Sequence, residues 1–155
     1  MTGASGLLGR AVYAHFITQP HEVLGLANSR ADAPLVKQDL LDDEALRERI
    51  RQFSPDMIVH AAAERRPDVV EKEPLRSQEL NVDVPGRLAE LCKELNARLI
   101  YISTDYVFDG SKPPYSVDSE PNPLNAYGAS KLLGERVVRE KGQEGMVTSL
   151  RVPVL

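Results

Sequence analysis

The chain has 155 residues, a length that suits one domain with a single buried core, and 42% of its residues are hydrophobic. Its formal net charge of −4 argues against a nucleic-acid-binding protein, and it has no apolar run of the ~20 residues that a membrane span needs. The single cysteine, Cys92, excludes an internal disulfide and favours a reducing compartment. We therefore expect a cytoplasmic protein with no nucleic-acid and no membrane partner.

Short apolar runs alternate with segments of helical periodicity in the first part of the chain. We expect a helix over residues 7–18, a strand over 21–27 and a short strand over 35–41. Asp42 is expected to cap a helix that Pro55 ends. Residues 56–61, with the sequence DMIVHA, are typical of a buried strand.

The same alternation continues in the second part. We expect a helix over residues 78–96 in which Pro85 lacks a backbone N–H and frees the carbonyl of Asn81. We interpret this as a kink, the alternative being a polar site for a water near a lysine. A strand over 98–104, a proline-rich irregular loop over 109–123, a helix over 125–140 and a strand over 146–152 are expected to follow.

This order predicts an α/β fold with a Rossmann-type, doubly wound parallel sheet, as one NAD(P)-binding domain over residues 1–155. Such a fold has a central strand of ~5 residues before its glycine loop, but only Met1 and Thr2 precede Gly3. The chain also stops at Val154 and Leu155, where a substrate-binding part would follow. We expect a partial domain that lacks its first strand and its C-terminal part, either a fragment or a truncated gene model. Such a piece is expected to aggregate when expressed alone.

A glycine loop opens the first expected helix, with the sequence GASGLLG over residues 3–9. Glycines allow a tight turn and let backbone N–H groups approach a pyrophosphate at the helix N-terminus. The motif taken alone fits a structural turn equally well. The expected cofactor contacts in it are Gly3, Ser5, Gly6, Leu7, Leu8 and Gly9.

The segment after the second expected strand predicts which cofactor is bound. An acidic residue there favours NAD, but this chain has Asn28, Ser29 and Arg30, with no carboxylate before Asp32. Because Ser29 and Arg30 can donate hydrogen bonds to a 2′-phosphate, we expect NADP, with NAD as the alternative. Arg30 also fits a solvent-facing turn residue. Asp39 and Leu40 are expected beside the adenine, with Asp39 as an acceptor.

A tyrosine and a lysine lie four residues apart in the last expected helix, in the sequence Tyr127-Gly-Ala-Ser-Lys131. This spacing places both side chains on one helix face, where a cation stabilises the phenolate of a tyrosine. A hydroxyl at the end of the preceding strand, from Ser103 or Thr104, would polarise a substrate carbonyl. We therefore name Thr104, Tyr127 and Lys131 as candidate catalytic residues and no residue as a metal ligand. His60 and Cys92 are expected to be core residues.

These motifs together resemble the dTDP-dehydrorhamnose reductases and their relatives, of the extended short-chain dehydrogenase/reductase group. The resemblance covers essentially the whole chain. It also includes Asn81-Val82, the sequence STDYVFDG over 103–110 and Pro-Leu-Asn over 123–125. The segment AAERRPDVVE over 62–71 is more specific, because it resembles the regulatory β subunits of methionine adenosyltransferase.

The second resemblance implies an NADP-binding protein that associates with a methionine adenosyltransferase catalytic subunit in S-adenosylmethionine biosynthesis, a part of one-carbon metabolism. It places residues 3–8 and 28–30 at the phosphates, with Ala61, Arg65, Tyr127 and Lys131 also near the cofactor. The intact Thr104, Tyr127 and Lys131 set leaves an alternative, an NADPH-dependent oxidoreductase acting on a nucleotide-linked keto-sugar. A decayed paralogue with neither role is the third hypothesis, so the sequence leaves open whether the chain is an enzyme.

Overall fold

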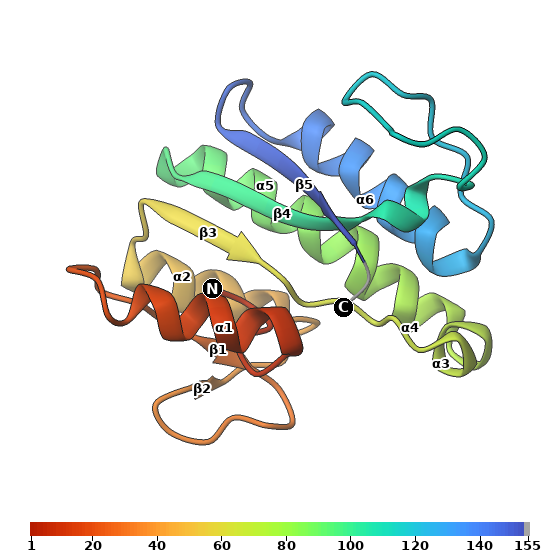
Figure 1. Ribbon diagram of the computed structural model, residues 1–155. Coiled ribbons are helices and arrows are strands. Elements are labelled where there is room, and N and C mark those ends of the chain that lie inside the picture. Colours follow the sequence, from red (N-terminus) through yellow and green to blue (C-terminus); the bar gives the residue numbers. More distant parts are fainter. Residues whose placement is uncertain (154–155) are drawn as a thin grey trace.

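The computed structural model describes residues 1–153, apart from the side chain of Pro67, and its helices and strands alternate along the chain (Figure 1). Val154 and Leu155 lie outside the described residues. The elements are α1 (Leu7–Phe16), β1 (Leu26–Ala27), β2 (Val36–Lys37), α2 (Asp43–Phe53), β3 (Met57–His60), α3 (Pro67–Lys72), α4 (Pro74–Gln78), the π-helical turn η1 (Glu79–Asp83), α5 (Val84–Leu95), β4 (Arg98–Thr104), the 3-10 turn η2 (Asp105–Val107), α6 (Ala126–Lys141) and β5 (Val147–Val152).

All the strands are parallel, and one residue joins two groups of them into a single surface. β1 pairs with β2, and β4 pairs with both β3 and β5. Thr2 forms parallel bridges with Leu26 of β1 and with His60 of β3, so it lies between the two groups. The order across the sheet is therefore β2, β1, Thr2, β3, β4 and β5. Within residues 1–153, only the start of the chain occupies the central place between β1 and β3.

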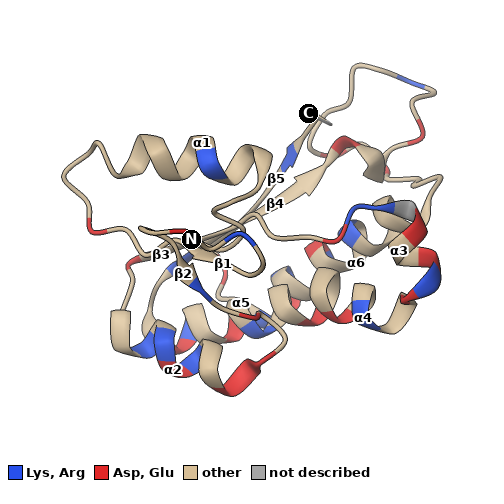
Figure 2. Ribbon diagram, turned by 90° about the horizontal axis from the view of Figure 1, so that it is seen from below, with Lys and Arg blue, Asp and Glu red and all other residues tan. Residues whose placement is uncertain are grey.

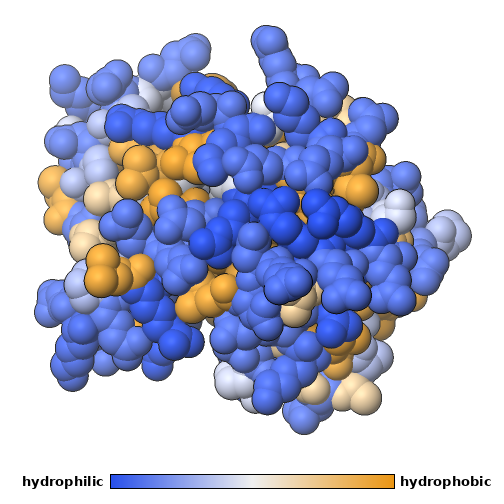
Figure 3. Space-filling view, turned by 180° about the vertical axis from the view of Figure 1, so that it is seen from behind, coloured by the Kyte–Doolittle hydropathy of each residue, from blue (hydrophilic) through white to orange (hydrophobic). Residues whose placement is uncertain are grey.

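Helices cover both faces of the sheet, which confirms the doubly wound α/β arrangement. α1 lies on one face, and α2, α5 and α6 lie on the other (Figure 2). The core fills the space beneath the second face, where Leu46, Leu88 and Leu99 are 1% exposed. The outward surface of these helices is mainly hydrophilic (Figure 3), and Arg47 there pairs with carboxylates of α2 and α5. None of the helices described is both long enough and apolar enough to cross a membrane.

The expected strands over 21–27 and 35–41 are shorter in the structure, where β1 and β2 have two residues each. The strands are short because only a few residues of these two segments have a backbone pairing partner. The backbone N–H of Leu26 donates to Met1, and that of Val36 donates to Gly25. Residues 21–24 instead run along a cavity, so their backbone stays outside any strand.

The kink expected at Pro85 takes the form of the π-helical turn η1, which separates α4 from α5. Pro85 lies in the first turn of α5, where a missing N–H costs least. The hydroxyl of Tyr101 donates to the carbonyl of Asn81 at 3.3 Å. The carbonyl that we expected Pro85 to free therefore accepts a hydrogen bond from a protein group, the hydroxyl of Tyr101.

Candidate functional site

The glycine loop follows Thr2 and leads directly into α1. Gly3 has a φ of 69°, and a Cβ at this position would lie 2.6 Å from the backbone nitrogen of Ala62. A Cβ on Gly9 would overlap the carbonyl oxygen of Gly3, so the helix packs directly on the loop. Gly6 is the N-cap residue of α1 and supplies no side chain to the first turn. The N–H groups at this helix end are therefore left to an anion, and the loop fits the diphosphate of a dinucleotide.

The residues predicted to select the cofactor lie in the turn after β1, where Asn28, Ser29 and Arg30 are all exposed. Asp39 is also exposed, and its carboxylate accepts a hydrogen bond from the backbone N–H of Leu41 at 3.0 Å. Leu40 is 7% exposed and packs in the core. If Leu40 contacts a cofactor, it therefore does so through its backbone.

The loop after β3, residues 61–66, reaches both the glycine loop and α6. Its first residue, Ala61, donates a backbone hydrogen bond to Thr2 at 3.3 Å, which places it beside Gly3. Further along, Asn81 is fully buried, and its Oδ1 accepts the backbone N–H of Glu64 at 2.8 Å. The Nδ2 of Asn81 donates to the carbonyl of Glu64 at 2.9 Å and to the hydroxyl of Ser130 at 3.1 Å.

Thr104 and Tyr127 lie at the same end of the sheet, because the turn η2 packs on the first turn of α6. A Cβ on Gly128 would overlap the carbonyl oxygen of Tyr106, and the Tyr106 and Tyr127 rings meet edge to face at 6.5 Å. Thr104 is 3% exposed, and its hydroxyl donates to Asp105 and accepts from the N–H of Tyr106, both at 3.2 Å. The structure thus brings these two candidates to one region.

The other candidate hydroxyl, Ser103, lies on the opposite face of β4 from Thr104, because side chains alternate along a strand. It shares its face with Tyr101 and is 2% exposed. Within the described residues its Oγ has no hydrogen-bond partner. The two hydroxyls that the sequence left as alternatives therefore point to different sides of the sheet.

The cation that acts on Tyr127 is Arg65. Burial raises the pKa of the Tyr127 phenol, the positive charge of Arg65 opposes this rise, and the Asp105 carboxylate adds to it. We expected Lys131 to stabilise the phenolate, and this stays a prediction, because in the structure the ammonium of Lys131 lies over the Tyr101 ring. Sequence spacing gave no sign of Arg65 in this role, because 62 positions separate it from Tyr127.

Lys131 instead lies in the core, where it is 2% exposed and its Nζ is 3.9 Å from the centre of the Tyr101 ring. Burial lowers the pKa of Lys131 to about 7, although Glu135, one turn further along α6, opposes this shift. Glu135 itself forms a two-pronged ion pair with Arg151 of β5, at 3.0 and 2.7 Å. The lysine predicted to hold a cofactor is therefore packed on an aromatic ring here.

His60 and Cys92 are core residues, as expected. His60 is fully buried, its Nδ1 lies 2.7 Å from the hydroxyl of Thr2, and its ring stacks on Tyr101. Burial, with the charge of Lys131, lowers the pKa of His60 to about 3, so this imidazole is neutral. Cys92 is 2% exposed, and burial raises the pKa of its thiol to about 12. Neither side chain takes part in the candidate site.

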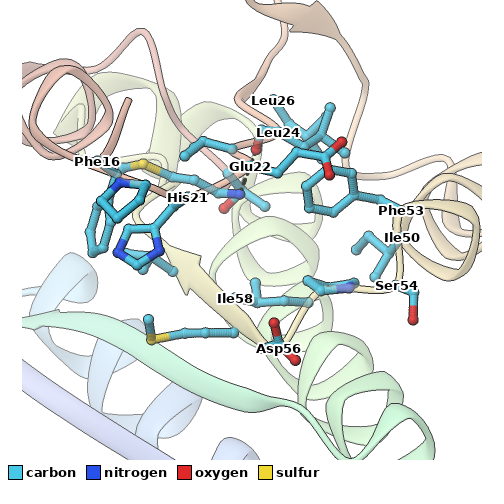
Figure 4. Close-up of a pocket in the computed structure, with 17 residues that line it drawn as sticks. Phe16, His21, Glu22, Leu24, Leu26, Ile50, Phe53, Ser54, Asp56 and Ile58 are labelled. Carbon is cyan, nitrogen blue, oxygen red and sulfur yellow. Dashed lines mark hydrogen bonds between the residues drawn. The ribbon is translucent and has the colours of Figure 1, made fainter. Parts of the chain in front are cut away.

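A cavity of about 440 Å³ lies beside Met1 and Thr2 at the amino ends of the strands (Figure 4). Leu24 and Phe53 line one part of it and Ile58 another, with Phe16 of α1 nearby. None of the candidate site residues lines this cavity. It lies in line with Met1 and Thr2, between the amino ends of β1 and β3. The cavity therefore belongs to the sheet and is separate from the candidate site.

Known proteins are similar to this chain over its whole length. A family model described as "RmlD substrate binding domain" matches residues 1–155. The methionine adenosyltransferase 2 subunit beta of Bos taurus is 50% identical over 155 residues, which are 100% of this chain and 46% of that protein. The chain thus spans about half the length of this relative.

Two solved structures share the fold closely. The hypothetical dTDP-4-dehydrorhamnose reductase of Sulfolobus tokodaii has a TM-score of 0.87 and 35% identity, and the match covers 98% of this chain and 54% of that one. The dTDP-4-dehydrorhamnose reductase of Bacillus anthracis, solved in complex with NADP, has a TM-score of 0.84 and 29% identity. That match covers 98% of this chain and 51% of the other.

Proposed function

Because this chain belongs to the RmlD substrate-binding-domain family, we propose that it is the NADP-binding part of a regulatory subunit of methionine adenosyltransferase. The observation that carries this proposal is the 50% identity with a methionine adenosyltransferase 2 subunit beta, which extends over every residue of the chain. The solved reductases are less similar in sequence, at 35% and 29% identity. The protein would act in S-adenosylmethionine biosynthesis, in the cytoplasm, with the catalytic subunit as its partner.

The residues of the site fit NADP. The backbone of Gly3 to Leu8 would hold the diphosphate at the end of α1, and Ser29 and Arg30 would hold the 2′-phosphate beyond β1. Asp39 would accept from the adenine, and Ala61, Arg65 and Tyr127 would line the path toward the nicotinamide. Lys131 would have to leave the Tyr101 ring to reach the cofactor. NAD is the alternative cofactor, since nothing in the turn blocks a dinucleotide that lacks the 2′-phosphate.

A second candidate function is NADPH-dependent reduction of a nucleotide-linked keto-sugar. It is favoured by the meeting of Thr104 and Tyr127 at one end of the sheet. A bound NADPH would supply the hydride for this reduction. Tyr127 would give its proton to the carbonyl oxygen of the sugar, and the Thr104 hydroxyl would donate a hydrogen bond to the same oxygen. Burial raises the pKa of the Tyr127 phenol, which favours the protonated form that a proton donor needs.

Co-purification tests the regulatory role. The full-length protein that contains this chain is expected to copurify with a methionine adenosyltransferase catalytic subunit and to change its kinetics. The matched control is the catalytic subunit purified with an unrelated NADP-binding protein. An absence of association, together with unchanged kinetics of the catalytic subunit, contradicts the proposal.

An absorbance assay tests the reductase role. Loss of NADPH absorbance that depends on a nucleotide-linked keto-sugar, and that Tyr127→Phe abolishes, supports this second candidate. The Phe variant keeps the ring of Tyr127, so NADP binding serves as the control for its folding. A wild-type protein that is inert across a panel of such sugars rejects the reductase role and leaves the regulatory one.

A further inference from the structure

The β4–α6 loop, residues 108–125, leaves the turn η2 after β4 and returns to the start of α6 (Figure 1). Its two ends meet, because the backbone N–H of Asn122 donates to the carbonyl of Val107 at 2.9 Å. The Nδ2 of Asn122 also donates to the Oδ2 of Asp109, at 2.8 Å. Two hydrogen bonds from Asn122 therefore close the loop at its base.

The other carboxylate oxygen of Asp109 organises the inside of the loop. Its Oδ1 accepts the backbone N–H of Ser111 at 2.8 Å and the hydroxyl of Tyr115 at 3.1 Å. That hydroxyl in turn accepts the N–H of Lys112 at 3.2 Å. One carboxylate thus joins the start, the middle and the end of the loop. Hydrogen bonds to an ionised acceptor are stronger than bonds between neutral groups, so the Asp109 charge adds to each of these links.

The base of the loop is also fixed to the neighbouring elements. The Tyr115 and Phe108 rings stack with their centres 4.1 Å apart. The guanidinium of Arg151, on β5, lies 4.9 Å from the centre of the Phe108 ring, and Glu135 of α6 holds that guanidinium with two hydrogen bonds. A movement of the whole loop would therefore break contacts with both β5 and α6.

The closed end of the loop leads directly into the candidate site. Shortly after the closure, the side chain of Asn125 caps α6 by accepting the N–H of Gly128 at 2.7 Å. A Cβ on Gly128 would lie 3.2 Å from the side chain of Pro123, so the end of the loop packs closely on the first turn of α6. Tyr127 belongs to this turn, and its ring meets that of Tyr106 edge to face.

We propose that Asp109 is a positioning residue, which closes the β4–α6 loop and thereby holds Tyr127 against Tyr106 in the candidate site. Asp109 acts through Asn122 and the first turn of α6, and it does not itself contact a cofactor or a substrate. Tyr106 precedes the closure and Tyr127 follows it, so a loosened base is expected to separate the two rings. The consequence for NADP binding rests on the proposed function.

The first test weakens the closure in the full-length protein that contains this chain. In Asp109→Asn, one carboxylate oxygen becomes an amide, so the remaining oxygen serves either the start of the loop or Asn122, but not both. We expect Tyr127 to lose its fixed contact with the Tyr106 ring. ¹⁹F NMR of fluorotyrosine-labelled protein measures this loss, because the resonance of Tyr127 senses the neighbouring ring. Tyr127→Phe assigns the resonance, and Tyr106→Leu gives its position without that ring.

A double substitution tests the hydrogen bond itself. Asn122→Asp alone places two carboxylates side by side, so it is expected to move the Tyr127 resonance in the same direction as Asp109→Asn. When both substitutions are present, the new amide at position 109 donates to the new carboxylate at position 122. The donor and the acceptor are then exchanged and the two ends are joined again. We expect the double variant to return the Tyr127 resonance to its wild-type position, which a general loss of structure would not do.

Two variants in the same loop are the matched controls. Asp118→Asn makes the same chemical change at an exposed carboxylate. Ser119→Ala removes a hydroxyl that accepts the N–H of Ser116 at 2.8 Å, away from the closure. Both are expected to leave the Tyr127 resonance unchanged. If Asp109→Asn does not fold, Asn122→Ala carries the test, because it removes the side-chain donor and keeps the backbone hydrogen bond to Val107.

NADP affinity, measured by calorimetry, is the second readout. We expect Asp109→Asn to bind NADP about fivefold more weakly and the double variant to bind it as the wild type does. An unmoved Tyr127 resonance in a folded Asp109→Asn variant overturns the proposal, and so does a double variant that shows the sum of the two single effects. If the wild-type protein does not bind NADP, the proposed cofactor site fails, and the Tyr127 resonance still tests the role of Asp109.

Discussion

The ammonium of Lys131 lies 3.9 Å from the centre of the Tyr101 ring, so a residue of α6 places its charge in the core against β4. A cation over an aromatic face gains roughly 0.5–2 kcal/mol. Burial lowers the pKa of Lys131 by more than the attraction of Glu135 raises it. The neighbouring His60 is neutral, so it adds no second positive charge beside Lys131.

Replacing this lysine is expected to stabilise the domain. The pKa of Lys131 is about 7 in the folded protein, below its ordinary 10.5, so the unfolded chain binds more protons between these pH values. Stability therefore rises with pH over this window, and this contribution is lost as the pH falls from 10.5 to 7. Lys131→Met is expected to raise Tm at pH 7 by at least ~2 °C and to remove this pH dependence. Thermal unfolding from pH 6.5 to 10 measures both effects.

The control for this prediction is Lys112→Met, which changes an exposed lysine in the loop before α6. It is expected to leave Tm and its pH dependence unchanged. A lower Tm in Lys131→Met at pH 7 contradicts the prediction. Such a result would mean that the cation over Tyr101 contributes more than its burial costs.

Gly3 and Gly110 separate backbone strain from steric overlap. Both have positive φ, at 69° and 79°, but only Gly3 has neighbours that a Cβ would meet. Gly110→Ala is expected to cost roughly 1–2 kcal/mol in unfolding free energy, from the left-handed backbone alone. Gly3→Ala adds the overlap with Ala62, so it is expected to cost more and to abolish NADP binding. Denaturant unfolding and calorimetry measure the pair, and equal costs would show that the loop yields without strain.

Arg30 is expected to distinguish the two cofactors. It lies exposed in the turn after β1, where a charge-assisted contact reaches only a cofactor with a 2′-phosphate. Arg30→Ala is expected to weaken NADP binding by roughly 1–3 kcal/mol and to leave NAD binding unchanged. Lys37→Ala, at an exposed position on β2, is the matched control. Equal losses for both cofactors would show that Arg30 does not contact the 2′-phosphate.

The cavity beside Met1 is expected to accept a strand. The chain alone is expected to aggregate and to bind NADP poorly, because residues 21–24, which lie outside any strand, and apolar side chains line this cavity. An N-terminal extension of about five residues, with Val and Ile at the inward positions, is expected to raise Tm. Each apolar side chain that it buries contributes roughly 1.5–3 kcal/mol before the cost of ordering.

The amino terminus provides a second readout for this extension. Burial lowers the pKa of the Met1 amine from 8.0 to about 6, so stability falls as the pH falls from 8 to 6. Any extension replaces this amine by an amide and is expected to remove its contribution to the pH dependence. A Gly-Ser extension of the same length is the control, since it removes the amine but fills no apolar space. Equal Tm values for the two extensions would show that the cavity does not receive apolar side chains.

Local patterns were sufficient to predict most of the elements. Asp42 and Asn125 cap α2 and α6 through their side chains, and the apolar run over 98–104 forms β4 with the expected bounds. In these cases the cause lies within a few residues of the element itself. The strands β1 and β2 were overestimated, because strand length depends on a partner that a local pattern does not contain.

The sequence by itself determined the order of helices and strands, the glycine loop and the i, i+4 spacing of Tyr127 and Lys131. Only the tertiary structure decided that Lys131 packs on Tyr101, that Arg65 acts on Tyr127 and that Asn81 joins Glu64 to Ser130. The physical reason is range. Helix caps and periodicity depend on neighbours within one or two turns. Burial and long-range hydrogen bonds depend on residues that the fold brings together, and the two bonds of Asn81 reach across 17 and 49 positions.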